Sequence, residues 1–155
     1  MQYLYKNSAI FKYVLLISFT VFCATGCVSR YTEGPIFEPM DVPKGKAIIY
    51  IYNYDPDAMS GWGTGPVYVN DMQIIDTLPL GSYFVYVTHP GRHLIHSDSP
   101  SVDRPLDLSV GERESVYIYP YRKERIFFGI TCFGRKQPQE ALEEIKQCRR
   151  IQLRF

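Results

Sequence analysis

Two cysteines near the start of the sequence are the first residues whose chemistry needs an explanation. Cys23 and Cys27 lie in "VFCATGC", at the end of an apolar run. Thiols at this spacing fit a metal or redox pair, the last turn of a membrane helix, or a processing site. The uncharged run from Tyr13 to Gly26 would be about 21 Å long as a helix, which is short for a hydrocarbon core of ~30 Å. With Lys6 and Lys12 ahead of it, the run is typical of a secretory signal.

The residues just before Cys27 favour the processing site. "ATGC", Ala24 to Cys27, resembles a bacterial lipobox, in which small residues precede a cysteine whose sulfur receives diacylglycerol. The peptidase then cuts just before that cysteine, so residues 1–26 would be the signal peptide and Cys27 the lipidated first residue. Cys23 does not fit, because bulky Phe22 stands where a small residue is needed. An ordinary cleavable signal and an uncleaved anchor helix are the alternatives.

The residue after Cys27 bears on the destination of the protein. In enterobacteria an Asp at that position retains a lipoprotein in the inner membrane, and here the residue is Val28. The resemblance therefore implies a protein of the cell envelope, anchored by its lipid in the outer membrane and facing the periplasm. Loss of the leader lowers Lys plus Arg from 17 to 15, against 16 acidic residues, so we expect no nucleic-acid partner.

Two further cysteines, Cys132 and Cys148, remain in the mature chain. An even number of cysteines in an oxidising compartment indicates a disulfide. Closing a loop of this size would stabilise the fold by roughly 3 kcal/mol in the chain-entropy model. The alternatives are two free thiols or half of a metal site.

Three histidines, His89, His93 and His96, are the candidates for metal chemistry. His89 and His93 flank a predicted turn and could approach each other, whereas His96 would point to the opposite face of a regular strand. A metal-dependent or hydrolytic enzyme using His89 and His93 is one alternative function. Turn-flanking surface histidines are the simpler interpretation, so we expect no metal and no cofactor. The adjacent Glu143 and Glu144 are expected on different helix faces, in solvent.

One aromatic residue suggests a binding surface. Trp62, the only tryptophan, lies in the glycine-rich stretch "GWGTG", with Tyr54 close by. An aromatic side chain on a loop can contact a glycan, a lipid or a partner protein. Binding of cell-wall glycan through Trp62 and Tyr54 is therefore a second alternative function. The other interpretation is that Trp62 folds back to cap the domain.

The elements that would position these residues begin after a tether. Residues 27–46 contain three prolines and two glycines without a regular period, which predicts a lipidated N-terminus and an extended tether. The alternative is an ordered arm in which Ile36 and Phe37 fill pockets. The remainder, residues 47–155, is long enough for one domain.

Most of that domain is predicted to be strand. Residues 47–54 are apolar at nearly every position, which indicates a central strand covered on both faces. Asn70-Asp71, Pro90-Gly91 and Gly111 are predicted turns. They join strands at 67–69 and 73–78, at 82–88 and 92–97, and at 106–110 and 115–121. Residues 127–132 and 149–155 read as further short strands, and residues 138–148 as the only helix. The pattern predicts a mainly β protein, an immunoglobulin-like antiparallel β-sandwich with one short C-terminal helix.

The order of these motifs resembles a known but uncharacterised family. The stretches "GSYF" at 81–84, "PGRH" at 90–93 and "GERESVYIY" at 111–119 resemble a domain-of-unknown-function family of small bacterial envelope lipoproteins. The resemblance covers about residues 46–146 and implies a prealbumin-like β-sandwich. It supplies no reaction, cofactor or catalytic residue. We therefore expect a non-catalytic binding or structural module whose partners are the membrane and an envelope protein or cell-wall component.

Overall fold

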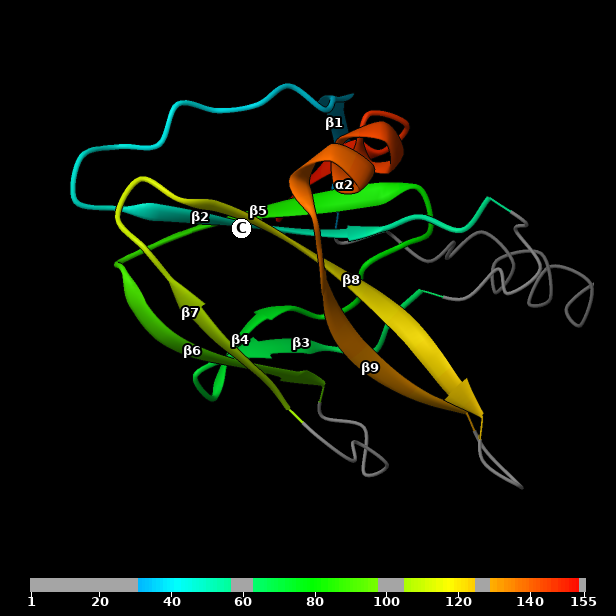
Figure 1. The fold of residues 1–155 in the computed structure, drawn as a ribbon. Coiled ribbons are helices and arrows are strands. Elements are labelled where there is room, and N and C mark those ends of the chain that lie inside the picture. The colour runs from blue at the N-terminus through cyan, green and yellow to red at the C-terminus, as the bar shows by residue number, and fades with distance from the viewer. Residues whose placement is uncertain (1–30, 57–62, 98–104, 125–128, 154–155) are drawn as a thin grey trace, which may run out of the picture. The chain divides into compact units, whose positions relative to one another are not determined.

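The computed structural model describes residues 31–56, 63–97, 105–124 and 129–153, which form two β-sheets and one helix (Figure 1). A six-stranded sheet has the order β1-β10-β5-β2-β8-β9, and a four-stranded sheet has the order β4-β3-β6-β7. The elements are β1 Tyr31–Ile36, β2 Ala47–Asn53, β3 Val67–Val69, β4 Met72–Ile75, β5 Ser82–Thr88, β6 Gly91–Ser97, β7 Leu106–Val110, β8 Ser115–Glu124, β9 Gly129–Lys136, α2 Pro138–Ile145 and β10 Arg149–Leu153. The predicted mainly β fold with one short helix is confirmed.

Strand β2 is the centre of the larger sheet. All seven of its residues are buried, and it lies between β5 and β8. Its β-branched and aromatic side chains suit this position, because a strand covered on both faces needs no polar face. The prediction of a central strand covered on both faces is confirmed.

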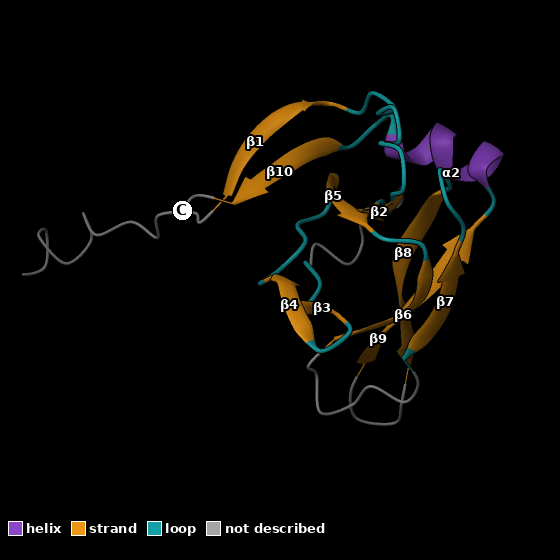
Figure 2. Cartoon of the chain, turned by 90° about the vertical axis from the view of Figure 1, so that its left-hand side faces the viewer, coloured by secondary structure: helices purple, strands orange, loops and turns teal. Residues whose placement is uncertain are grey.

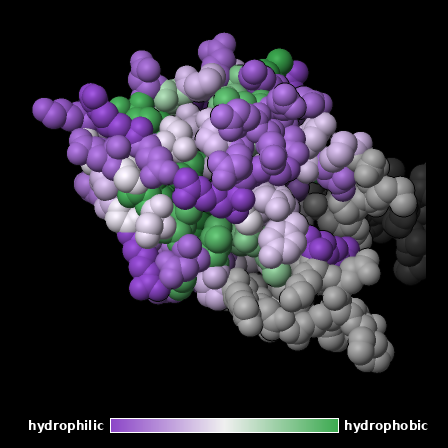
Figure 3. All heavy atoms as spheres, viewed as in Figure 1, coloured by the Kyte–Doolittle hydropathy of each residue, from purple (hydrophilic) through white to green (hydrophobic). Residues whose placement is uncertain are grey.

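Apolar side chains form a core on each face of the six-stranded sheet. The first core lies between the two sheets and includes Ile49 and Ile51 of β2, Val69 of β3 and Ile95 of β6. The second lies on the outer face, where α2 and the chain around Phe37 cover a group of tyrosines. Figure 3 shows hydrophilic residues over most of the face drawn there, with hydrophobic residues in small separate areas among them.

The hairpin β3–β4 forms at the predicted turn. Asn70 and Asp71 have φ angles of 50° and 64°, as the two central residues of a type I′ turn require. Asn and Asp tolerate this left-handed conformation better than most residues. The pairing of Val69 with Met72 closes a two-residue loop.

The turns at Pro90-Gly91 and Gly111 do not close hairpins as predicted. They carry the chain from one sheet to the other, since β5 and β8 belong to the six-stranded sheet and β6 and β7 to the four-stranded sheet. Moreover, β2 pairs with β8, and β5 with β10, in parallel. The larger sheet is therefore mixed, and the prediction of a wholly antiparallel sandwich is wrong for it.

The expected tether is also wrong for residues 31–37. Tyr31–Ile36 forms strand β1, which pairs antiparallel with β10 (Figure 2). Phe37 is only 5% exposed and packs edge-on against Tyr50 and Tyr83 at centroid distances of 5.2 and 5.3 Å. Ile36, in contrast, is 56% exposed. The ordered-arm alternative thus describes this segment, with Phe37 alone of the pair in a pocket.

Helix α2 begins where the sequence predicts. Pro138 occupies the first turn, where a missing N–H costs nothing. Ala141 and Ile145 are buried against the outer face of the six-stranded sheet. The helix ends at Ile145, and the chain turns through Cys148 into β10.

Candidate functional site

His93 occupies a closed hydrogen-bond arrangement beside the β3–β4 turn. Asn70 Oδ1 accepts a bond of 2.9 Å from the Leu94 N–H, which leaves its Nδ2 as a donor to His93 Nδ1 at 3.1 Å. Nδ1 must then be the acceptor, so Nε2 carries the proton and donates to the His89 carbonyl oxygen at 3.0 Å. Both ring nitrogens of buried His93 are therefore used within the protein, and the ring ties β6 to the turn.

The other two histidines lie apart from that ring. His89 is exposed, and its Nε2 accepts a bond of 2.8 Å from Lys46 Nζ. His96 stacks on Tyr68 at a centroid distance of 5.1 Å, with Asp71 at 3.4 Å from its Nε2. Burial alternates along β6, so His93 and His96 lie on opposite faces, as predicted. Within the described ranges, no three His, Cys, Asp or Glu side chains lie close enough to hold a metal ion.

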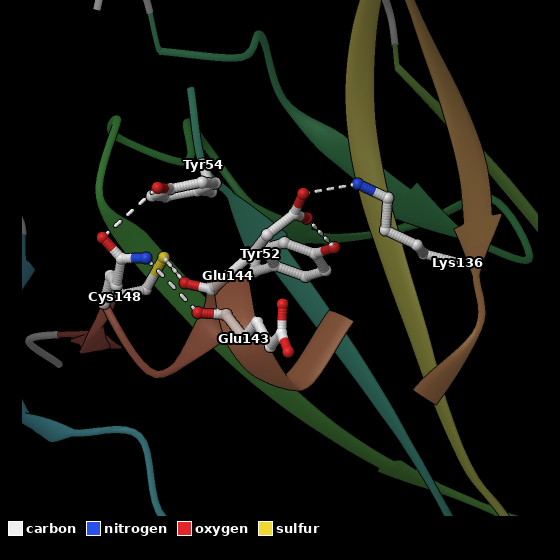
Figure 4. Close-up of polar contacts among 7 residues, drawn as sticks. Tyr52, Tyr54, Lys136, Glu143, Glu144 and Cys148 are labelled. Carbon is white, nitrogen blue, oxygen red and sulfur yellow. Dashed lines mark hydrogen bonds and ion pairs between the residues drawn. The ribbon is translucent and has the colours of Figure 1, made fainter. Parts of the chain in front are cut away.

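A cluster of polar side chains joins α2 to the six-stranded sheet (Figure 4). Half-buried Glu144 accepts a bond of 2.7 Å from Tyr52 Oη of β2, and one of 2.6 Å from Lys136 Nζ of β9. Lys136 also lies 4.9 Å from the ring centroid of Tyr119. Glu143 is exposed, as predicted, but Glu144 is not, and the prediction of a solvated Glu144 is wrong.

Tyr52 and Cys148, both next to Glu144, keep their protons, which fits a structural role for these side chains. Burial, reinforced by the Glu144 carboxylate, raises the pKa of the Tyr52 phenol above its ordinary value. Burial likewise raises the pKa of the Cys148 thiol to about 12. Both groups stay neutral at physiological pH, so neither is activated as a nucleophile or base. The arrangement holds the helix on the sheet.

The predicted disulfide between Cys132 and Cys148 is wrong, because both thiols are free and buried. Cys132 is part of β9, at one edge of the larger sheet. Cys148 directly precedes β10, and β5, β2 and β8 lie between β10 and β9. The distance from β10 to β9 is therefore about four strand spacings of ~4.8 Å, which exceeds the ~7 Å Cα separation that a disulfide can bridge. Cys148 Sγ instead lies 3.8 Å from the Glu144 carbonyl oxygen.

Of the two residues proposed to contact a ligand, Trp62 and Tyr54, the structure describes only Tyr54. Trp62 lies outside the described residues. Tyr54 is half-buried, and its hydroxyl donates to Gln147 Oε1 at 3.2 Å, so it belongs to the contact between the sheet and the segment after α2 (Figure 4).

The proposed anchor residue Cys27 and the apolar run before it lie outside the described residues as well. Among the residues that are described, no helix has the length and apolar character needed to cross a membrane.

Local sequence patterns did not indicate the Tyr52–Glu144–Lys136 cluster. Tyr52 and Glu144 are 92 positions apart, and the acidic helix surface looks the same in sequence whether or not one carboxylate turns inward. The Asn70–His93 contact had a partial signal, because Asn70 lies in one predicted turn and His93 flanks another. Their pairing depends on the β3–β6 register, which places Val69 opposite Ile95.

Comparisons of the chain with protein-family models, with curated proteins and with solved structures found no match.

Proposed function

We propose that this protein is a lipid-anchored lipoprotein of the bacterial envelope, and that its domain is a non-catalytic binding or structural module. The observation that carries the proposal is "ATGC" at the end of a basic and apolar leader, which supplies a thiol where lipid attachment requires one. Diacylglycerol on Cys27, with its two acyl chains, holds a protein at a membrane durably. Val28 supports the outer membrane, and thus a domain facing the periplasm.

The polar clusters support a binding or structural role over catalysis. His93 uses both ring nitrogens internally, and Glu144 accepts bonds from Tyr52 and Lys136. The bonds of His93 connect β6 to the β3–β4 turn, and those of Glu144 connect α2 to the six-stranded sheet. The partners we propose are the membrane, through the anchor, and an envelope protein or cell-wall component.

The finer architecture is part of the same proposal. Two packed sheets joined by crossing turns support a prealbumin-like or immunoglobulin-like sandwich, with a mixed larger sheet as a departure from the type. Membership in the family of small envelope lipoproteins is proposed on the same motifs as before, "GSYF", "PGRH" and "GERESVYIY".

Labelling with a palmitate analogue in cells tests the anchor, with the two leader-end cysteines as a matched pair. The parent and a Cys23→Ser variant should both incorporate label and float with membranes, and the intact mass should begin at a diacylglyceryl-modified Cys27. A Cys27→Ser variant should lose both label and flotation. Label retained in Cys27→Ser, or an intact leader in the parent, would reject the proposal.

A further inference from the structure

Strand β1 begins very close in sequence to the proposed anchor. Val28, Ser29 and Arg30 are the only residues between Cys27 and Tyr31, the first residue of β1. Four Cα–Cα steps of ~3.3–3.6 Å reach about 14 Å at most, whatever conformation these residues adopt. The six-residue strand itself spans roughly 20 Å. The link from lipid to fold is therefore shorter than the first strand.

The start of β1 is joined to the rest of the domain through β10. Tyr31 pairs with Leu153 and Thr32 with Gln152, so the C-terminal end of β10 lies beside the start of β1. Figure 2 shows these two strands extending to one side, with the arrowhead of β10 outermost. β10 pairs onward with β5, and Phe37 anchors the other end of β1 in the outer core. Arg149 and Arg150 are the residues of β10 that pair with β5, so a constraint on Tyr31 reaches the domain through the two-stranded β1–β10 pair.

The sequence adds positive charge at this same end. Arg30 directly precedes Tyr31, and Arg154 directly follows Leu153. Basic residues near a bilayer surface are attracted to anionic headgroups. The sequence therefore supplies basic residues next to the two paired residues that lie nearest the proposed anchor.

From these observations we propose that the Tyr31–Leu153 end of the β1–β10 pair is apposed to the anionic phospholipid surface that carries the anchor. The inference rests on the proposed function, since it takes Cys27 as the lipidated residue. The opposite edge of the larger sheet, strand β9, then points away from the membrane. The domain then lies at the bilayer surface, and its β9 edge is accessible to periplasmic partners.

Energy transfer from the protein to the headgroups tests this orientation. The processed, full-length protein is reconstituted into vesicles of phosphatidylethanolamine with a minor fraction of phosphatidylglycerol, with a headgroup acceptor dye. Gln152→Cys in β10 and Gln137→Cys after β9 are a matched pair of exposed positions for a donor dye. The native Cys132 and Cys148 are buried, which restricts labelling to the introduced thiol.

We expect roughly twofold more transfer from position 152 than from 137, because about four strand spacings of ~4.8 Å separate β10 from β9. Insertion of about 20 Gly and Ser residues after Ser29 gives a link with a mean reach of ~25 Å and should remove most of the difference. Arg154→Gln, or vesicles of phosphatidylcholine alone, should reduce it.

Two failures are distinguishable. Protein that floats with the vesicles but shows equal transfer from both positions, or a difference that the insertion leaves unchanged, overturns the apposition while the anchor stands. Protein that does not float, and whose mass lacks the lipid, overturns both.

Discussion

Glu144 connects elements that are distant in the sequence. It lies on α2, and its carboxylate accepts bonds from Tyr52 on β2 and Lys136 on β9. The Glu144 side chain is 26% exposed and that of Lys136 24%, so water screens the pair less than a surface ion pair. Loss of the carboxylate would leave a buried phenol and a partly buried ammonium without their acceptor.

We therefore expect Glu144→Ala to lower the free energy of unfolding by about 1–3 kcal/mol, and Tyr52→Phe by about 1 kcal/mol. Glu143→Ala is the matched control, because Glu143 is exposed on the same helix and should change stability by less than ~0.5 kcal/mol. Urea denaturation of the purified variants measures all three. Equal effects of Glu143→Ala and Glu144→Ala would show that the cluster is not what holds α2.

The residues of the candidate site were only partly predictable. Turn chemistry identified Asn70 and Asp71, because positive φ favours a few residue types that sequence displays directly. The opposite faces of His93 and His96 followed from the two-residue period of a strand. Glu144 and the free thiols were missed, because their surroundings depend on strand order, which no local pattern contains.

Among the strands and the helix, those with strong signals in neighbouring residues were predicted correctly, whereas pairings between distant segments were not. β2, the β3–β4 turn and the Pro138 start of α2 carried strong local signals and are confirmed. The turns at Pro90-Gly91 and Gly111 were located, but a turn residue looks alike whether the next strand returns to the same sheet or enters the other. β1 was missed because "YTEGPI" contains Gly and Pro, and its pairing depends on β10 at the far end of the sequence.

The N-terminal arm offers a test of this element within two adjacent residues. Phe37→Ala should lower the free energy of unfolding by about 3–4 kcal/mol, because it empties a pocket between Tyr50 and Tyr83. Ile36→Ala should have little effect, since Ile36 is 56% exposed. Thermal unfolding and amide hydrogen exchange across residues 31–37 measure the outcome. Similar melting temperatures for the two variants would contradict the packed arm.

At the scale of the whole molecule, tyrosines dominate the outer core of the larger sheet. Burial raises the pKa of Tyr50, Tyr52, Tyr83 and Tyr117 above the ordinary value of 10.0, and that of the Cys148 thiol from 9.0 to about 12. Each group binds its proton more tightly in the folded state than in the unfolded state. The unfolded state therefore loses protons first as the pH rises, which favours unfolding.

The stabilisation from these groups is fully present below about pH 9 and decreases as the pH rises through the ordinary thiol and phenol values toward the folded ones. We expect the urea midpoint to fall steadily from pH 9 to 11, with tyrosinate absorbance appearing together with unfolding. Tyr117→Phe removes one of the titrating groups and should flatten the dependence. A midpoint that stays constant across this range would contradict the buried phenols.

The position of β10 has a consequence for the order in which the molecule assembles. β1, nearest the start of the described domain, joins the larger sheet through β10, the last strand of the described chain. During synthesis, every intervening residue has to emerge before the edge strand finds its hydrogen-bonding neighbour. Strand β1 thus remains unpaired longest, and its pairing with β10 joins the earliest and the latest of the described strands.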